Sequence, residues 1–507
     1  MLHTHEGISR RRLLAGLGLA AGAALTEASV LPRSQLPGWD ARTGVLVVGA
    51  GAAGVCAAIE AARAGAEVLI VESMPRPGGS SAMSAGVVYA GGGTALQRAL
   101  GVQDGVEDMY RFLASAGPHA PLDKIQVYCE ESAAHFDWLR AQGIPYRERL
   151  SRARGAPATD ESLYYSGNEL AWPAREVARP APRGHLPGLA GTAGGRRMME
   201  ILLARAGALG VRLRTGVAAR QLVVESDGRV AGLIVDAAGQ RQAIGAARAV
   251  VLACGGFVYD RQMLRRHAPA LYECSAAWAG AGDLGDGIKL AVAAGAATVH
   301  MEHGCAEAPL AGLDSVLAGI LVNAAGQRFI AEDSSPLMVG DAIVRHQGGR
   351  AWLIADQRSA PATRQDRFLA AARGNTLGDV AVQLDLPRGA LQHSIAYYNR
   401  HAANGEDPLW RKSPALVRPL QGPPYTAWNL SVADSFFPVY TLGGLQTTVG
   451  GAVLNGFGEV IGGLYAVGRT AAGLPVAPCI AQGLSLGDCT FFGRRAGAAA
   501  ARGEGLA

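Results

Sequence analysis

The sequence predicts an α/β protein with a Rossmann-like dinucleotide-binding domain, and three adjacent features near its start carry this prediction. Residues 45–48, Val-Leu-Val-Val, form a short apolar run rich in β-branched side chains, as in a strand that is buried on both faces. The pattern G-x-G-x-x-G follows at once at 49–54, and residues 55–64 have the composition of a helix. Strand, glycine turn and helix in this order open a dinucleotide-binding unit.

The three glycines of the turn have separate expected roles. Gly49 permits the tight turn, Gly51 lets the backbone approach a pyrophosphate, and Gly54 lets the helix pack closely on the strand. The pyrophosphate would lie beside Ala53, on free backbone amides at the positive end of the helix. The turn is therefore expected to hold the phosphates of the cofactor.

A second strand and an acidic residue complete this unit. Gly65 ends the helix, and residues 67–71, apolar after Glu67, predict a strand that delivers Glu72. We expect the Glu72 carboxylate to accept hydrogen bonds from the hydroxyls of the adenosine ribose. The full unit with its acidic residue indicates a dinucleotide site and leaves open whether the dinucleotide is FAD or NAD.

The loop that follows Glu72 distinguishes these two cofactors. It is rich in glycine and serine, where nicotinamide-dependent enzymes would continue with another strand and helix. Its hydroxyls and amides can meet the phosphate and ribityl oxygens of a longer cofactor, which indicates FAD. The loop residues expected to contact FAD are Ser73, Gly79, Ser80, Ser81, Ser84 and Gly86. The loop contains no histidine, so we expect the FAD to be noncovalent.

In this loop and beyond it the chain resembles the fumarate-reductase-like flavoproteins. In that family a Gly-Gly pair, a small polar pair and a further glycine follow the ribose-binding glutamate, as they do here. Segments 250–257, 463–469 and 483–488 resemble later elements of the same flavin domain. The resemblance implies that the remaining FAD contacts are Val217, Gly255, Asp286, Gly468, Arg469, Ser485 and Leu486. The last two would lie at the pyrimidine edge of the flavin, where a helix begins.

The resemblance also implies a discontinuous FAD-binding domain with an inserted α+β capping domain. The expected limits are 40–281 and 431–507 for the FAD-binding domain and 282–430 for the cap. Within the cap, residues 319–330 predict two strands joined by a turn, and 391–401 have helical periodicity. We expect 120–188 to be a helical insertion of the FAD-binding domain.

Bulk composition excludes several other classes of protein. The chain has 507 residues, 49% of them hydrophobic, which is enough for two globular domains. The net charge of +5 is carried by arginines without a basic run beyond the first dozen residues, so nucleic-acid binding is not expected. The seven cysteines are scattered without zinc-ligand spacing, and we expect neither a metal site nor a disulfide framework.

The first thirty residues resemble a twin-arginine signal segment. A basic run at Arg10, Arg11 and Arg12 precedes an apolar stretch, 13–25, that is too short to span a bilayer as a mature helix. We therefore expect residues 1–30 to direct export to the periplasm or beyond, and we expect no stable membrane span in the mature chain. Export of a folded protein suits a chain that acquires a bulky cofactor first.

The pattern around the expected substrate pocket argues against a small dicarboxylate. The family's dicarboxylate reducers hold their buried dianion with two arginines and a histidine. At the matching places this chain has residues 333–336 after Glu332, Val439 before Tyr440, and residues 478–482 before the last helix, without an arginine or histidine. A neutral, apolar organic substrate fits such a pocket better.

In residues 84–94 and 484–495 the chain looks closest to the 3-ketosteroid dehydrogenase branch of this family, particularly the Δ4-(5α) type. Such an enzyme transfers a hydride between flavin N5 and a carbon–carbon bond next to a carbonyl. The tyrosines that serve there as acid and base are replaced here by Ser335 and Cys479. We therefore name Tyr440, Tyr89 and Cys479 as candidate catalytic residues, with core tyrosines and a structural thiol as the alternative interpretation.

Two other functions remain open at this point. One is a fumarate- or enoate-type reductase with a rearranged anion site, and the other is an exported flavin-binding protein without catalysis. The chain lacks the C-x-x-C-H pattern of haem attachment, so an enzyme of this kind would exchange electrons with a separate acceptor or donor.

The signal segment leads to a first prediction. Replacing Arg10 and Arg11 by lysine should leave the precursor in the cytoplasm, because the twin-arginine route reads the arginine pair. Fractionation of cells followed by immunoblotting measures this. Unchanged export of the double variant would exclude that route.

Overall fold

The computed structural model describes residues 29–152, 160–189, 193–274, 276–310, 317–359 and 369–503. The twin-arginine pair and the apolar run behind it lie outside these residues. Among the residues that are described, no helix has the length and apolarity needed to cross a membrane.

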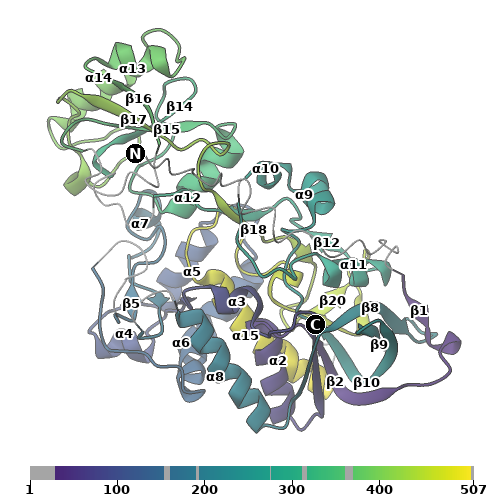
Figure 1. Cartoon of the computed structure of the whole chain (residues 1–507). Coiled ribbons are helices and arrows are strands. Elements are labelled where there is room, and N and C mark those ends of the chain that lie inside the picture. Colours follow the sequence, from purple (N-terminus) through teal and green to yellow (C-terminus); the bar gives the residue numbers. More distant parts are fainter. Residues whose placement is uncertain are drawn as a thin grey trace, which may run out of the picture.

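A large mixed sheet forms the centre of the main body (Figure 1). Its strand order is β1-β8-β9-β10-β2-β3-β7, and β21 and β20 extend it from β10. The strands are β1 Leu31–Pro32, β2 Ala41–Val48, β3 Val68–Glu72, β7 Arg212–Thr215, β8 Val217–Val224, β9 Val230–Ala237, β10 Gln240–Leu252, β20 Ala452–Leu454 and β21 Val460–Ala466. Strands β21, β10, β2, β3 and β7 run parallel, so their carboxyl ends meet at one edge.

The parallel strands are buried on both faces, as their continuous apolar runs predict. Val45 and Val47 of β2 pack with the helices on one face, whereas Leu46 and Val48 pack in the core on the other face. This alternation follows from the two-residue period of a strand. Helices α2 (Ala52–Arg63), α8 (Gly194–Ala208) and α15 (Leu484–Arg502) contribute to the first of these cores.

Helices α2 and α15 pack side by side through glycines. A Cβ atom on Gly493 would lie 2.5 Å from the carbonyl oxygen of Ala53, and one on Gly497 would lie 2.0 Å from that of Ala57. From the first contact to the second, the residue number rises by four in both helices, so the helices run parallel. Gly493 stands nine positions after Leu484 and Ala53 stands one after the start of α2, so at about 1.5 Å per residue α15 begins roughly 12 Å before α2.

The outer unit at the top of Figure 1 has its own sheet and core. Its sheet has the order β14 (Ile320–Asn323), β15 (Ala351–Ala355), β17 (Tyr425–Asn429) and β16 (Ala370–Gly374), with α13 (Leu377–Gln383) and α14 (Ala390–Ala402) packed against it. The predicted fold class, a Rossmann-like domain with an inserted α+β unit, is confirmed.

The stretch between the main sheet and the outer unit pairs with the C-terminal segment of the chain. Strand β12 (Thr298–Val299) pairs with β19 (Gly444–Leu445), and β13 (Gly304–Ala306) pairs with β18 (Pro438–Thr441). The apolar core of the outer unit extends from Ile320 to Ala427. The limits 282 and 430 of the cap remain a prediction.

Two local expectations differ from the structure. Residues 327–330 do not form a full second strand: after the turn the chain pairs with β14 at one isolated antiparallel bridge, between Arg328 and Val322. In the described part of 120–188 the one long helix is α6 (Leu122–Ala141). The rest consists of the short α7 (Ala174–Val177) and the strands β5 (Leu163–Tyr164) and β6 (Gly184–His185), which form a small sheet with β4 (Val88–Tyr89).

The close approach of α2 and α15 leads to a stability prediction. Gly497→Ala should lower the free energy of unfolding by about 1–3 kcal/mol, because its methyl group would overlap the Ala57 carbonyl. Gly207→Ala in the last turn of α8 is the matched control, since a Cβ there meets nothing within 4 Å. Thermal unfolding of both variants measures the difference. An equal melting temperature for the two variants would contradict this packing.

Candidate active site

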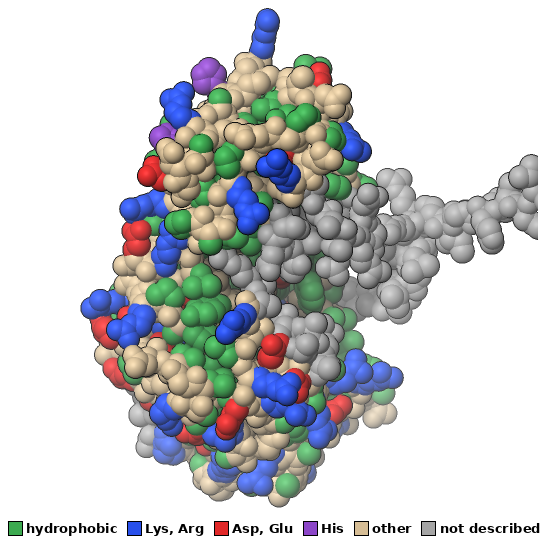
Figure 2. Space-filling model, turned by 90° about the vertical axis from the view of Figure 1, so that its left-hand side faces the viewer, with side chains coloured by type: hydrophobic (Ala, Val, Ile, Leu, Met, Phe, Trp, Pro, Cys, Tyr) green, Lys and Arg blue, Asp and Glu red, His purple; other side chains and the backbone are tan. Residues whose placement is uncertain are grey.

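A cavity of about 920 Å³ lies where the carboxyl ends of the parallel strands, the starts of α2 and α15, and the segment 332–337 meet. Of the residues predicted to bind the cofactor, it is lined by Gly49, Gly51, Ala53, Glu72, Ser73, Gly79, Ser80, Ser81, Ser84, Val217, Gly255, Asp286, Gly468, Arg469, Ser485 and Leu486. In the face seen in Figure 2, hydrophobic side chains gather at the level between the outer unit and the main body.

The glycine turn is shaped as its sequence predicts. Gly49 has φ of +106°, and a Cβ on it would lie 2.3 Å from the Ala253 carbonyl oxygen. A Cβ on Gly54 would lie 2.0 Å from the carbonyl oxygen of Gly49, which fits close packing of helix and strand. A Cβ on Gly51 would meet nothing closer than 3.8 Å and would project beside the cavity. Space for a ligand is therefore left at Gly51.

Glu72 fixes the turn from the end of β3. One carboxylate oxygen accepts from the backbone N–H of Ala50 at 2.8 Å, and the other accepts from that of Met74 at 2.8 Å. The sequence did not indicate these backbone contacts. Because Glu72 also lines the cavity, contact with a ribose stays a prediction compatible with its position.

Arg469 connects three separate segments at the cavity wall. Its Nη2 donates to Ser80 Oγ at 2.6 Å and lies 2.5 Å from a carboxylate oxygen of Asp283. Its Nη1 is buried without a hydrogen-bond partner among the described residues. A buried donor of this kind calls for an acceptor from a bound group. The phosphate and flavin oxygens of FAD would supply such acceptors.

The start of α15 forms the other end of the cavity. Gly483 precedes the helix with φ of +86°, and no side chain caps the helix start. The adjacent Ser485 and Leu486 line the cavity, so the positive end of α15 faces it. Together with the open cradle at Gly51 and the donor of Arg469, this end fits a long cofactor with anionic groups.

Two predicted cofactor residues do not line the cavity. A Cβ on Gly86 would lie 2.6 Å from the backbone of Gly194, so this glycine lets the loop pack on α8. Gly54 serves the helix–strand contact described above. Their roles in packing are visible in the structure, and direct contact with FAD stays untested.

Tyr440 lines the cavity on strand β18. It stands opposite Cys305 of the antiparallel strand β13. Burial, followed by the neighbouring Cys305 and Cys479, raises the pKa of the Tyr440 phenol well above its usual value. Its hydroxyl therefore keeps its proton at physiological pH and can donate it.

Tyr89 lies behind the cavity wall rather than in it. Its side chain is fully buried, and it is absent from the cavity lining. The phenol oxygen lies 3.4 Å from the Arg183 guanidinium, and Arg183 is held in turn by Asp104. These contacts favour the structural role for Tyr89.

Cys479 and Ser335 also have local structural partners. The Cys479 thiol is buried, lies 3.8 Å from the Ala481 carbonyl oxygen, and does not line the cavity. Ser335 does line the cavity, but its Oγ accepts from the N–H of Met338 and caps α12 (Pro336–Asp341). Neither side chain replaces the missing tyrosines in this arrangement.

The sequence analysis did not single out Glu307, which lines the cavity just past β13. Burial raises the pKa of the Glu307 carboxyl to about 7. No motif marks this residue, because its position depends on the pairing of β13 with β18 across more than a hundred residues. An acidic residue between apolar positions was the one signal available.

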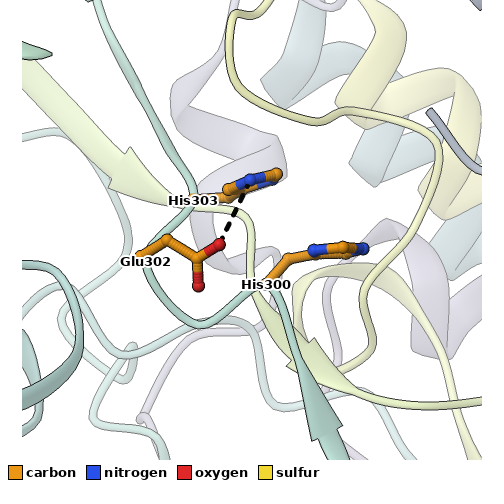
Figure 3. A group of neighbouring side chains, drawn as sticks. All are labelled: His300, Glu302 and His303. Atoms are coloured by element: carbon orange, nitrogen blue, oxygen red, sulfur yellow. Dashed lines mark ion pairs between the residues drawn. The ribbon is translucent and has the colours of Figure 1, made fainter. Parts of the chain in front are cut away.

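His300, Glu302 and His303 form a cluster in the turn between strands β12 and β13 (Figure 3). His303 Nε2 lies 3.4 Å from the carboxylate of Glu302, and His303 Nδ1 accepts from the backbone N–H of Ala477. A metal ion on Nε2 would put the ring proton on Nδ1, facing the Ala477 N–H. His303 is therefore better suited to a hydrogen bond between its turn and the segment at Ala477 than to binding a metal ion.

Comparisons with known proteins agree with this geometry. The FAD binding domain family matches residues 44–477. The solved 3-ketosteroid-Δ4-(5α)-dehydrogenase of Rhodococcus jostii RHA1, in complex with 4-androstene-3,17-dione, is 39% identical and covers 93% of this chain and 99% of its own, with a TM-score of 0.87.

Two curated relatives are more distant. The 3-oxo-5-alpha-steroid 4-dehydrogenase of Comamonas testosteroni is 29% identical over 85% of this chain and 93% of its own length. The probable fumarate reductase Ifc3 of Shewanella frigidimarina is 28% identical over 91% of this chain and 75% of its own length. With the cavity that fits FAD, these findings show that the chain belongs to the FAD binding domain family and is an FAD-dependent oxidoreductase acting on CH–CH groups.

Proposed function

We propose that this enzyme transfers a hydride between FAD and the carbon–carbon bond next to the carbonyl of a neutral, steroid-like ketone. The similarity to a solved ketosteroid dehydrogenase over nearly the whole chain supports this substrate class. The relatives named as dehydrogenases favour removal of hydrogen from this carbon–carbon bond over addition of hydrogen to it.

The charge of the cavity lining carries the proposal. Among the described lining residues Arg469 is the one cationic side chain, and it is paired with Asp283. A buried dicarboxylate would need further cations. The lining also includes the apolar residues Leu170, Ala171, Leu310, Leu317, Pro336, Leu337 and Pro438. This lining favours a neutral ring system and disfavours a fumarate- or enoate-type reductase.

The chain's own residues supply binding, orientation and proton transfer. FAD, when bound, supplies the hydride-transfer chemistry. The turn at Gly51, Arg469 and the start of α15 would hold it along the cavity. Tyr440, protonated at physiological pH, would donate to the ketone oxygen as negative charge develops there.

Export and the electron acceptor belong to the same proposal. We infer that the twin-arginine segment carries the loaded protein out of the cytoplasm and that a separate partner exchanges electrons with the flavin. Both rest on the sequence features described above.

The substrate class is tested directly by anaerobic mixing. Purified holoenzyme is combined with a panel of saturated and unsaturated 3-ketosteroids and enoates while the flavin absorbance is recorded. Bleaching by a saturated ketosteroid supports the proposal. Bleaching by none of the ketosteroids would overturn it.

The cofactor site gives a second test. Gly51→Val should yield folded protein without bound flavin, because the side chain would occupy the space left for the pyrophosphate. Gly207→Val on the exposed side of α8 is the control that should keep its flavin. Flavin content is measured by absorbance after purification. Stoichiometric flavin in Gly51→Val would contradict the assigned site.

The role of Tyr440 gives a third test. Tyr440→Phe should keep the fold and FAD but slow single-turnover flavin reduction by about 10²- to 10³-fold, since loss of a hydrogen-bond donor to a developing oxyanion has that effect. Tyr397→Phe on the surface of α14 is the matched control. A Tyr440→Phe rate within about threefold of wild type would exclude this tyrosine, because that lies well below the expected loss.

A further inference from the structure

Six carboxyl groups of the described residues line the cavity, and one of them differs from the rest. They belong to Glu72, Asp283, Asp286, Glu307, Glu332 and Asp333. Five are held by a cation or by backbone amides: Glu72 by Ala50 and Met74, Asp283 by Arg469, Asp286 by Lys289, Glu332 by Arg328 and Lys412, and Asp333 by Ser413 and Arg175. For Glu307 no cation among the described residues lies within ion-pair distance, and an amide of Gln482 is its neighbour.

Gln482 holds the Glu307 carboxyl at the cavity wall. Its Nε2 donates to Glu307 Oε1 at 3.4 Å, and its own amide oxygen accepts from the Tyr164 hydroxyl at 3.5 Å. The backbone of Gln482 is fixed by two hydrogen bonds with Ser166. The carboxyl is therefore positioned by neutral groups next to Gly483, where α15 begins.

Strand pairing places Glu307 and Tyr440 on the same face. Tyr440 is directly opposite Cys305, and the N–H of Glu307 donates to the Pro438 carbonyl at 3.1 Å, which continues this register. Residues 305 and 307 share one side of their strand. Diagonal neighbours across such a pair are roughly 7–8 Å apart. Both residues line the cavity, so a ligand bound there could contact both side chains.

The groups around Glu307 are neutral in the pH range of interest. Two titratable side chains sense its charge. Burial raises the pKa of Tyr164 of β5, and a hydrogen bond with Cys479, followed by burial, raises the pKa of Cys305 of β13. Gln482 brings no charge. Burial is the cause that raises the pKa of Glu307 to about 7, so near neutral pH both protonation states are populated.

We propose that Glu307 is the catalytic base of this enzyme, a role that rests on the proposed function. Its carboxylate would take the proton from the carbon next to the ketone while the adjacent carbon loses a hydride to the bound FAD. The electron pair of the broken C–H bond becomes the new C=C bond, and the ketone oxygen keeps the hydrogen bond from Tyr440. Glu307 thereby takes the place of a tyrosine that this chain lacks.

Proton transfer can be measured apart from hydride transfer. Holoenzyme is reduced with dithionite under anaerobic conditions, so that it cannot accept a hydride, and is then mixed in D₂O with the saturated 3-ketosteroid that bleaches the wild type. Mass spectrometry follows deuterium uptake next to the ketone. Wild type should exchange faster than buffer, with a rate that rises with pH through about 7, because only the ionised Glu307 accepts a proton.

Glu307→Gln should slow this exchange by about 10²- to 10⁴-fold and remove the pH dependence, as expected for loss of a general base. Glu307→Asp keeps a carboxyl and should recover part of the rate, while the exposed Glu273→Gln is the control. Retained flavin absorbance in each variant verifies the fold. Exchange by Glu307→Gln within about threefold of wild type would overturn this inference alone. Absence of both flavin reduction and exchange in the wild type would overturn the proposed function and this inference together.

Discussion

The parallel packing of α2 and α15 is the constraint on which the active site depends. Gly493 and Gly497 let the two helix backbones touch at Ala53 and Ala57, where side chains would keep them apart. The contact fixes the offset between the two helix starts, and each start faces the same cavity. Two segments separated by more than four hundred residues thus supply the two positive ends between which an extended anionic cofactor can lie.

The buried charged groups that the structure describes around this cavity are of two kinds, those held by an opposite charge or by backbone amides and one carboxyl that has neither. Arg469 is paired with Asp283, and Arg328 with Glu332 and Asp407, so most buried charges near the cavity are compensated. A buried charge without such compensation is expensive, and its pKa shifts instead. Among the described carboxyl groups that line the cavity, Glu307 is the one without a compensating cation or backbone amide, and its pKa is raised. Buried groups with strongly shifted pKa values cluster at catalytic sites in proteins, where protons are transferred.

Local motifs made the cofactor half of the site predictable. The strand, turn and helix at 45–63 and the helix start at 483–486 carry their function within a few consecutive residues, so their sequence identifies them. The substrate half depends on contacts between distant segments. Tyr89 was the second candidate after Tyr440 in the sequence, but it packs behind the wall, where β4 pairs with β6. Glu307 was missed for the same reason, because its position depends on the pairing of β13 with the distant β18.

The substrate half of the site is built from residues that lie far apart in the chain. Ser335 caps α12 and Cys479 packs against the Ala481 carbonyl, so both side chains serve local structure here. The strand pair β13–β18 brings a phenol and a carboxyl to one face of the cavity. A ketone needs a donor for its oxygen and an acceptor for the neighbouring proton, and the positions of these groups matter more than their order in the chain.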